Sequence, residues 1–204
     1  MRQQLRMDMH VHSRYSSKPS QWILKKLGCP ESFTAPKYIY DQARARGMDF
    51  VTITDHNVID GALDIAHLDG SFISEEVTAY FPEDRCKLHV LVYNINEEQH
   101  RDIQRLRENV FDLCAYLRSE GLTHAMAHPL FAVNDKLTIG HFEKSLLLFD
   151  IFEANGCRDT MQNTVLSAIL SSLTPQHMHR LEELHGLGAL SVTPWMKGMV
   201  GGSD

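Results

Sequence analysis

Short apolar runs in this chain stop repeatedly at a histidine or a carboxylate, and this recurrence constrains the fold more than any other feature. The first example is the stretch Met7–Ser13, which places His10 and His12 two residues apart. Residues two apart in a β-strand point to the same face, so both imidazoles would enter one cavity. Taken alone, the pair also fits two solvated histidines on an exposed strand. Its repetition elsewhere favours a shared metal site, because imidazole is the commonest metal ligand.

Strand-like and helix-like patterns alternate along the chain. The alternation predicts a largely parallel sheet with helices outside it, and in a (β/α) barrel the functional residues lie at the carboxyl ends of the strands. Strands are expected at residues 5–11, 50–54, 71–80, 87–95, 122–127, 149–154, 189–193 and 199–204, and helices at 36–46, 61–67, 97–120, 138–148, 160–171 and 175–185.

Potential metal ligands follow six of these expected strands. Each has a simpler interpretation: His56 follows an aspartate and suits a turn, and His89 between two apolar residues suits a core histidine bonded to a backbone carbonyl. Pro129 is expected to hold the backbone of His128 extended. The other seven histidines are interpreted as structural or solvated. The residues at the strand ends are His10, His12, Asp55, His56, Glu76, His89, His128 and Asp204.

Length and charge narrow the class of protein. The 204 residues, 43% of them hydrophobic, suit one domain over residues 1–204. A net charge of -6 argues against general nucleic-acid or membrane-surface binding. No apolar run has the length of a membrane span, so we expect a cytoplasmic protein. The four cysteines form no Cys-x-x-Cys pair, which argues against a thiolate zinc site and a disulfide framework.

Six short motifs, in order, resemble those of the PHP family, named for polymerase and histidinol phosphatase domains. The resemblance covers essentially the whole chain. It implies an α/β fold of the distorted (β/α)7 TIM-like barrel type, two or three divalent metal ions (zinc, manganese or iron), and hydrolysis of phosphate esters. The motifs are Asp8–Ser13, Thr54–Asn57, Glu76–Thr78, Leu88–Val90, Ala127–Pro129 and Gly202–Asp204.

The resemblance also implies a set of ligands. Glu76 would bridge two metals, and it is preferred to Glu75 because the family has a Glu-apolar-Thr or Glu-apolar-Ser pattern; neighbouring strand residues point opposite ways, so only one can face the site. The first metal would be held by His10, His12, Glu76 and Asp204, and the second by Glu76, His89 and His128.

Two departures from the family concern a third metal. Ser17 stands in the first loop where an acid or imidazole is expected, and the sequence stops at Asp204, two residues before the family's last histidine. His56 alone remains of that ligand set. We therefore expect two well-held metals, a weak or empty third position, and a fragment of a longer protein whose barrel is truncated at its last strand.

The expected chemistry is attack of a metal-activated water on a small phosphorylated substrate. Asp204 and His56 are the candidate catalytic residues, Asp204 orienting the water and His56 binding a third metal or the leaving oxygen. Arg158, Arg14 and Lys18 are candidates to neutralise the substrate phosphate, or are solvated surface charges. Two alternatives stay open: an amidohydrolase-like enzyme acting on a non-phosphate bond, and a catalytically weak metal-binding regulatory module attached to another domain such as a glycosyltransferase. The oligomeric state stays open as well.

Overall fold

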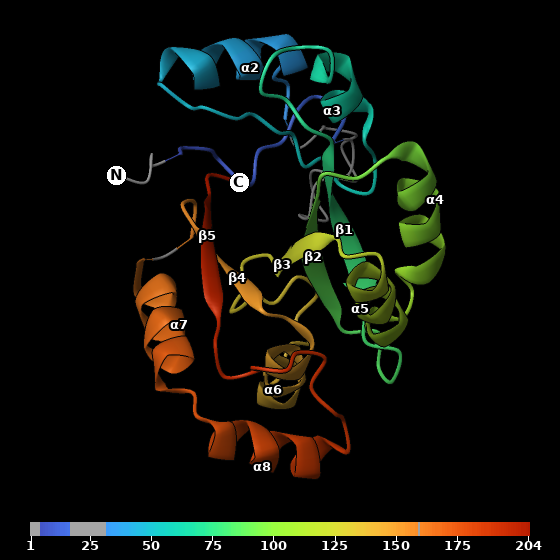
Figure 1. The fold of residues 1–204 in the computed structure, drawn as a ribbon, viewed down its shortest axis with the longest axis vertical. Coiled ribbons are helices and arrows are strands. Elements are labelled where there is room, and N and C mark those ends of the chain that lie inside the picture. The colour runs from blue at the N-terminus through green and yellow to red at the C-terminus, as the bar shows by residue number, and fades with distance from the viewer. Residues whose placement is uncertain (1–4, 17–31, 159) are drawn as a thin grey trace.

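The structure is a computed structural model that describes residues 5–16, 32–158 and 160–204, and it shows a mixed α/β fold (Figure 1). The described residues contain one five-stranded sheet with the strand order β1-β2-β3-β4-β5. The elements are α2 (Pro36–Ala45), α3 (Asp60–Ile65), β1 (Ser74–Tyr80), β2 (Lys87–Tyr93), α4 (Glu97–Leu106), α5 (Val110–Ser119), β3 (Thr123–Met126), α6 (Ile139–Leu148), β4 (Ile151–Asn155), α7 (Thr160–Ser172), α8 (Pro175–His185) and β5 (Gly198–Gly202).

The sheet is mixed, so the expectation of a largely parallel sheet was only half right. β1 pairs with β2 and β2 with β3 in antiparallel fashion, while β3–β4 and β4–β5 are parallel. The turn between β1 and β2 is too short for a parallel crossover, which needs a dozen or more residues. It is closed by Phe81 N–H donating to the Cys86 carbonyl at 2.9 Å.

The sheet does not close on itself by continuous pairing, and the (β/α)7 barrel is not confirmed. The two segments expected as strands at 5–11 and 50–54 form no ladder, although Val51 makes an isolated bridge with Ser71. They lie between the outer edges of β5 and β1 and contact their neighbours through scattered backbone hydrogen bonds and isolated bridges. These backbone contacts run from Met9 N to Gly201 O (3.1 Å), from Thr54 N to Val11 O (2.9 Å) and from Glu76 N to Asp55 O (3.2 Å).

Two other expected elements were wrong. The helix expected over 97–120 is two helices, α4 and α5, because Asn109 caps a new start by accepting a hydrogen bond from Phe111 N–H. The strand expected at 189–193 is a series of bends, and the edge of β4 is paired instead with β5. None of the helices within the described ranges is long and apolar enough to cross a membrane.

The strands present alternate residues to two different cores. Val90 and Val92 of β2 pack in the main core beneath the helices, whereas Leu91 and Tyr93 belong to a second cluster on the inner face of the sheet. His89 is two residues before Leu91 and therefore shares this inner face. The same alternation on β1 places Val77 in the main core and its neighbour Glu76 on the inner face. The strand period thus determines which polar side chains point inward.

Candidate metal centre

Six side chains gather around Glu76 on the inner face and form with it a cluster of seven residues. All of them were predicted as ligands from the sequence, and the structure brings them together; their binding of metal stays a prediction. Glu76 is fully buried and its neighbour Glu75 points the other way, where it bonds with His100 and Gln104 of α4. The seven residues are His10, His12, His56, Glu76, His89, His128 and Asp204.

The first group has the spacing of a tetrahedral cation site. The Nε2 atoms of His10 and His12 lie 3.1 Å apart, and each lies 3.1 Å from Glu76 Oε2. Asp204 Oδ1 lies 3.6 Å from the His10 nitrogen and 3.4 Å from the His12 nitrogen. Ligand atoms about 2.0–2.1 Å from a tetrahedral Zn²⁺ are about 3.3–3.4 Å apart. The ligand atoms of His10, His12 and Glu76 therefore fit a divalent cation, and Asp204 is close enough to His10 and His12 to be a fourth ligand.

The second group is built on the other oxygen of the same carboxylate. Glu76 Oε1 lies 2.8 Å from His89 Nδ1 and 3.2 Å from His128 Nε2, and these two nitrogens are 3.2 Å apart. Three donors with this spacing leave a position open for a further ligand, as catalytic metal sites do. One carboxylate thus faces two sets of imidazoles, which suits a bridge between two cations.

The hydrogen bonding of Glu76 indicates that this carboxylate needs a cation. Its Oε2 atom is buried and makes no aligned hydrogen bond with the described residues, although the nitrogens of His10, His12 and His56 lie 3.0–3.1 Å away. A buried carboxylate is costly unless positive charge compensates it, and imidazole nitrogens face this oxygen. A metal ion shared with the imidazoles would remove that cost.

The charges of the centre are strongly coupled. Burial alone would raise the pKa of Glu76, but the surrounding imidazoles, His56 and His10 first, lower it well below its usual range. Burial would lower the pKa of His10, and the carboxylates of Glu76 and Glu153 instead raise it well above its usual range. The metal-free centre therefore holds protons, and metal binding must displace them.

His89 differs from the other imidazoles. Burial is the main reason that the pKa of His89 is lowered to about 4. The neighbouring His56 and His128 lower it further, whereas the Glu76 carboxylate raises it. The side chain is therefore neutral at pH 7, the form in which an imidazole nitrogen binds a metal.

His56 lies within the cluster rather than apart from it. Its Nδ1 is 3.0 Å from Glu76 Oε2, and its ring lies 4.8 Å from that of His12 and 4.7 Å from that of His89, measured between centroids. The residue that the resemblance assigned to a third metal is thus in reach of the first two groups. Two residues discussed from the sequence lie outside the described residues. They are Ser17, which stands where a ligand of the third metal is expected, and Lys18, a candidate to bind the substrate phosphate.

One buried acid of the centre was missed from the sequence. Glu153 of β4 is fully buried and its Oε1 lies 2.8 Å from His10 Nδ1. One feature of the sequence could have indicated this residue: it is a carboxylate within the otherwise apolar strand pattern of residues 149–154. The expected extended backbone at His128 was wrong: its φ is 28°, and its N–H donates to Glu153 Oε2 at 2.8 Å, a contact that holds a conformation unusual for a non-glycine residue.

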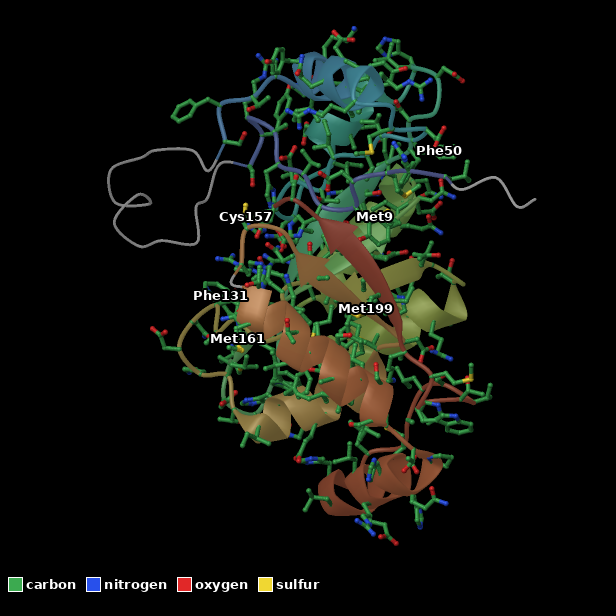
Figure 2. The ribbon with its side chains drawn as sticks, turned by 90° about the vertical axis from the view of Figure 1, so that its left-hand side faces the viewer. Met9, Phe50, Phe131, Cys157, Met161 and Met199 are labelled. Carbon is green, nitrogen blue, oxygen red and sulfur yellow. The ribbon has the colours of Figure 1, made fainter. Side chains whose placement is uncertain are left out.

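A cavity of about 420 Å³ opens beside the first group, with His12, Cys157, Arg158 and Asp204 in its lining. Arg158 Nη2 lies 3.3 Å from Asp204 Oδ2, and its guanidinium carbon lies 3.9 Å from the centre of the Phe131 ring. Figure 2 shows Phe131 and Cys157 on the same side of the molecule, close to the start of α7.

Arg14 has a different environment from Arg158. Its side chain is exposed, and its guanidinium carbon lies 5.4 Å from the centre of the Tyr15 ring. Of the two predicted phosphate-binding cations within the described residues, Arg14 and Arg158, the structure places Arg158 beside the ligand cluster.

Comparison with solved structures shows a shared fold. A protein of Bifidobacterium adolescentis, provisionally described as a metal-dependent phosphoesterase, superposes with a TM-score of 0.56 at 12% identity, covering 97% of this chain and 86% of its own. An amidohydrolase of Chromobacterium violaceum, solved with sulfate and without metal, gives 0.55 at 14% identity with the same coverage. At these identities the likeness is one of fold.

Two further comparisons are weaker. A two-domain protein of Bacteroides vulgatus, described as containing a predicted PHP-like metal-dependent phosphoesterase, has a TM-score of 0.47 at 14% identity and covers 81% of this chain and 48% of its own. An uncharacterised protein of Methanocaldococcus jannaschii is 36% identical over 73 residues, which is 36% of this chain. That match spans 41% of the relative's length. No known family profile matches the chain.

Proposed function

We propose that the chain is a metal-dependent hydrolase of phosphate esters that uses two divalent ions, zinc, manganese or iron. The observation that carries the proposal is Glu76, a fully buried carboxylate whose two oxygens face two separate groups of imidazole nitrogens at 2.8–3.2 Å. His10, His12, Glu76 and Asp204 would hold one ion, and Glu76, His89 and His128 the other. When bound, paired divalent ions lower the pKa of a water towards about 7 and stabilise negative charge on phosphoryl oxygens.

The protein's own residues would position the reactants. Asp204 is held from two sides, since Asn155 Nδ2 donates to its Oδ2 at 3.0 Å and Arg158 Nη2 to the same oxygen at 3.3 Å. Its other oxygen faces the first group, so that it can accept a hydrogen bond from the attacking water and orient it. His56, whose Nδ1 lies 3.0 Å from Glu76 Oε2, would interact with the leaving oxygen.

Arg158 would bind the substrate phosphate. Its guanidinium stacks on Phe131 and borders the cavity that also contains His12 and Asp204. Arginine forms paired hydrogen bonds with phosphate oxygens, so a guanidinium beside the ligand cluster can neutralise a small phosphorylated substrate. A cavity of about 420 Å³ suits a small molecule.

The experiment that tests this proposal is a substrate panel with metal-loaded protein. Phosphomonoesters, phosphodiesters, amides and lactones are each incubated with protein loaded with Mn²⁺ and with Zn²⁺, and release of product is measured. Phosphate release that a chelator abolishes supports the phosphoesterase. Hydrolysis of amides or lactones alone would show instead that the site is amidohydrolase-like. Metal binding without turnover of any substrate would favour the regulatory module.

A further inference from the structure

One buried carboxylate outside the ligand set contacts both groups of ligands. Glu153 Oε1 lies 2.8 Å from His10 Nδ1 of the first group. Its Oε2 accepts a hydrogen bond from the backbone N–H of His128, which belongs to the second group, at 2.8 Å. The same Oε2 accepts a second hydrogen bond from Asn155 Nδ2 at 3.2 Å. Both oxygens are thus occupied, and each serves a different group.

The contact with His10 determines which nitrogen is available to a metal. An imidazole that donates Nδ1–H to a carboxylate presents the lone pair of Nε2, and the Nε2 of His10 faces His12 and Glu76 at 3.1 Å. Carboxylates that fix metal-ligating histidines in this way also raise the basicity of the bound nitrogen.

The contact with His128 acts on the backbone. A φ of 28° is sparsely populated for a residue with a side chain and persists where its surroundings hold it. The hydrogen bond from the His128 N–H to a buried charge is one such restraint, since charge-assisted bonds are about twice as strong as neutral ones. This backbone conformation directs the imidazole whose Nε2 lies 3.2 Å from Glu76 Oε1.

We propose that Glu153 is a positioning residue that supports both metal subsites, with Oε1 setting the imidazole of His10 and Oε2 setting the backbone of His128. The inference rests on the proposed metal centre. It assigns Glu153 no contact with substrate.

The substitution Glu153→Gln gives an asymmetric test. Glutamine offers one acceptor oxygen and one NH₂ group where glutamate offers two oxygens. The carbonyl oxygen belongs at the Oε2 position, because two donors, the His128 N–H and the Asn155 amide, point there. The NH₂ group then faces His10 Nδ1 and forces the imidazole proton onto Nε2, the atom required for metal binding. The first subsite should therefore weaken while the second is retained.

The experiment titrates metal-free protein with Zn²⁺ in competition with a chromogenic chelator. For Glu153→Gln we expect about 10–100-fold weaker binding of one Zn²⁺ and little change in the other, with the far-UV circular dichroism of the wild type. The matched control is Glu75→Gln, which removes another buried carboxylate bonded to an imidazole, that of His100, but outside the cluster. Both Zn²⁺ affinities should stay within about threefold of wild type in the control.

The outcomes separate this inference from the proposed function. Two unchanged Zn²⁺ affinities in Glu153→Gln would overturn the role of Glu153 and leave the metal centre intact. Wild-type protein that binds no Zn²⁺ would overturn the centre itself and this inference with it.

A second measurement needs no variant and tests the inference even if Glu153→Gln does not fold. In Zn²⁺-loaded wild type labelled with ¹⁵N-histidine, the imidazole of His10 should carry its proton on Nδ1. A His10 without a proton on Nδ1 would overturn the proposal.

Discussion

Gly202 lies against His10 so closely that a β-carbon on the glycine would be 2.3 Å from the β-carbon of the histidine. The same added atom would be 2.3 Å from Glu153 Oε1. No side chain fits there, so the glycine permits the contact between His10 and Glu153. We expect Gly202→Ala to displace the His10 imidazole, to weaken Zn²⁺ binding at least about tenfold and to destabilise the fold by about 1–3 kcal/mol.

The neighbouring residue of β5 provides the matched control for that substitution. A β-carbon at Gly201 meets nothing within 4 Å, so Gly201→Ala adds the same methyl group in open space. Chelator competition and urea denaturation should show the control close to wild type. Equal Zn²⁺ affinity in the two alanine variants would contradict the proposed packing requirement.

Glu76→Gln should abolish hydrolysis and leave the secondary structure in place. The amide keeps the shape of the side chain but loses the negative charge between the two groups of imidazoles, and its NH₂ replaces one acceptor oxygen. We expect metal content to fall below two ions per chain and phosphate release to fall at least about 10³-fold, since a nucleophile-generating site loses its bridge. Full turnover by a metal-loaded variant would count decisively against the bridging role.

Gly61→Ala tests the packing between the first loop and the segment that ends at Asp55. Ser13 donates both its N–H and its O–H to Asp55 at 2.6 Å, and a β-carbon at Gly61 would lie 2.2 Å from Asp55 Oδ2. The variant should lose about 1–3 kcal/mol of unfolding free energy in urea. Gly188→Ala, which meets nothing within 4 Å, should unfold like wild type; equal losses in both variants would contradict this account.

Lys197 should make stability depend on pH above neutrality. Its Nζ donates to the carbonyls of Leu146 and Phe149 at 2.7 Å, and burial lowers its pKa from 10.5 to about 8, although Asp150 opposes the shift. Between pH 8 and pH 10.5 the unfolded chain therefore binds more protons than the folded one. The free energy of unfolding contributed by this group consequently rises with pH in that window.

The measurement compares wild type with Lys197→Met by urea denaturation at pH 7.5 and pH 10. Allowing for screening by water, we expect the stability of wild type relative to the variant to increase by about 2 kcal/mol over this range. Groups that titrate equally in both proteins cancel in the difference. A difference that stays constant or decreases would show that the amine has an ordinary pKa.

The location of the centre could be predicted because strand periodicity decides which side chains share a face. His10 and His12 are two apart, and Glu76 and Glu75 are neighbours that must point opposite ways. Glu75 forms hydrogen bonds with His100 and Gln104 on the outer face, and Glu76 therefore points to the interior. These relationships involve residues close together in the chain, so they can be predicted from the sequence.

Other features depend on tertiary contacts that no local pattern records. The segment 5–11 has the composition of a strand, but its backbone hydrogen bonds to residues 49–54 and 201–204 are irregularly spaced, so it forms no ladder. The φ of 28° at His128 depends on the Glu153 carboxylate 25 residues later, not on Pro129 alone. The break between α4 and α5 was missed because the apolar spacing continues through it, although the cap at Asn109 was visible.

The central claim is that Glu76 bridges two metal ions, and the metal content per chain tests it most directly. Protein purified without chelator and reconstituted with Zn²⁺ or with Mn²⁺ is freed of excess metal and measured by elemental analysis. The account predicts about two ions per chain in wild type, since imidazole nitrogens gather at each of the two oxygens of Glu76. Wild-type protein that retains no ion with either metal would contradict it.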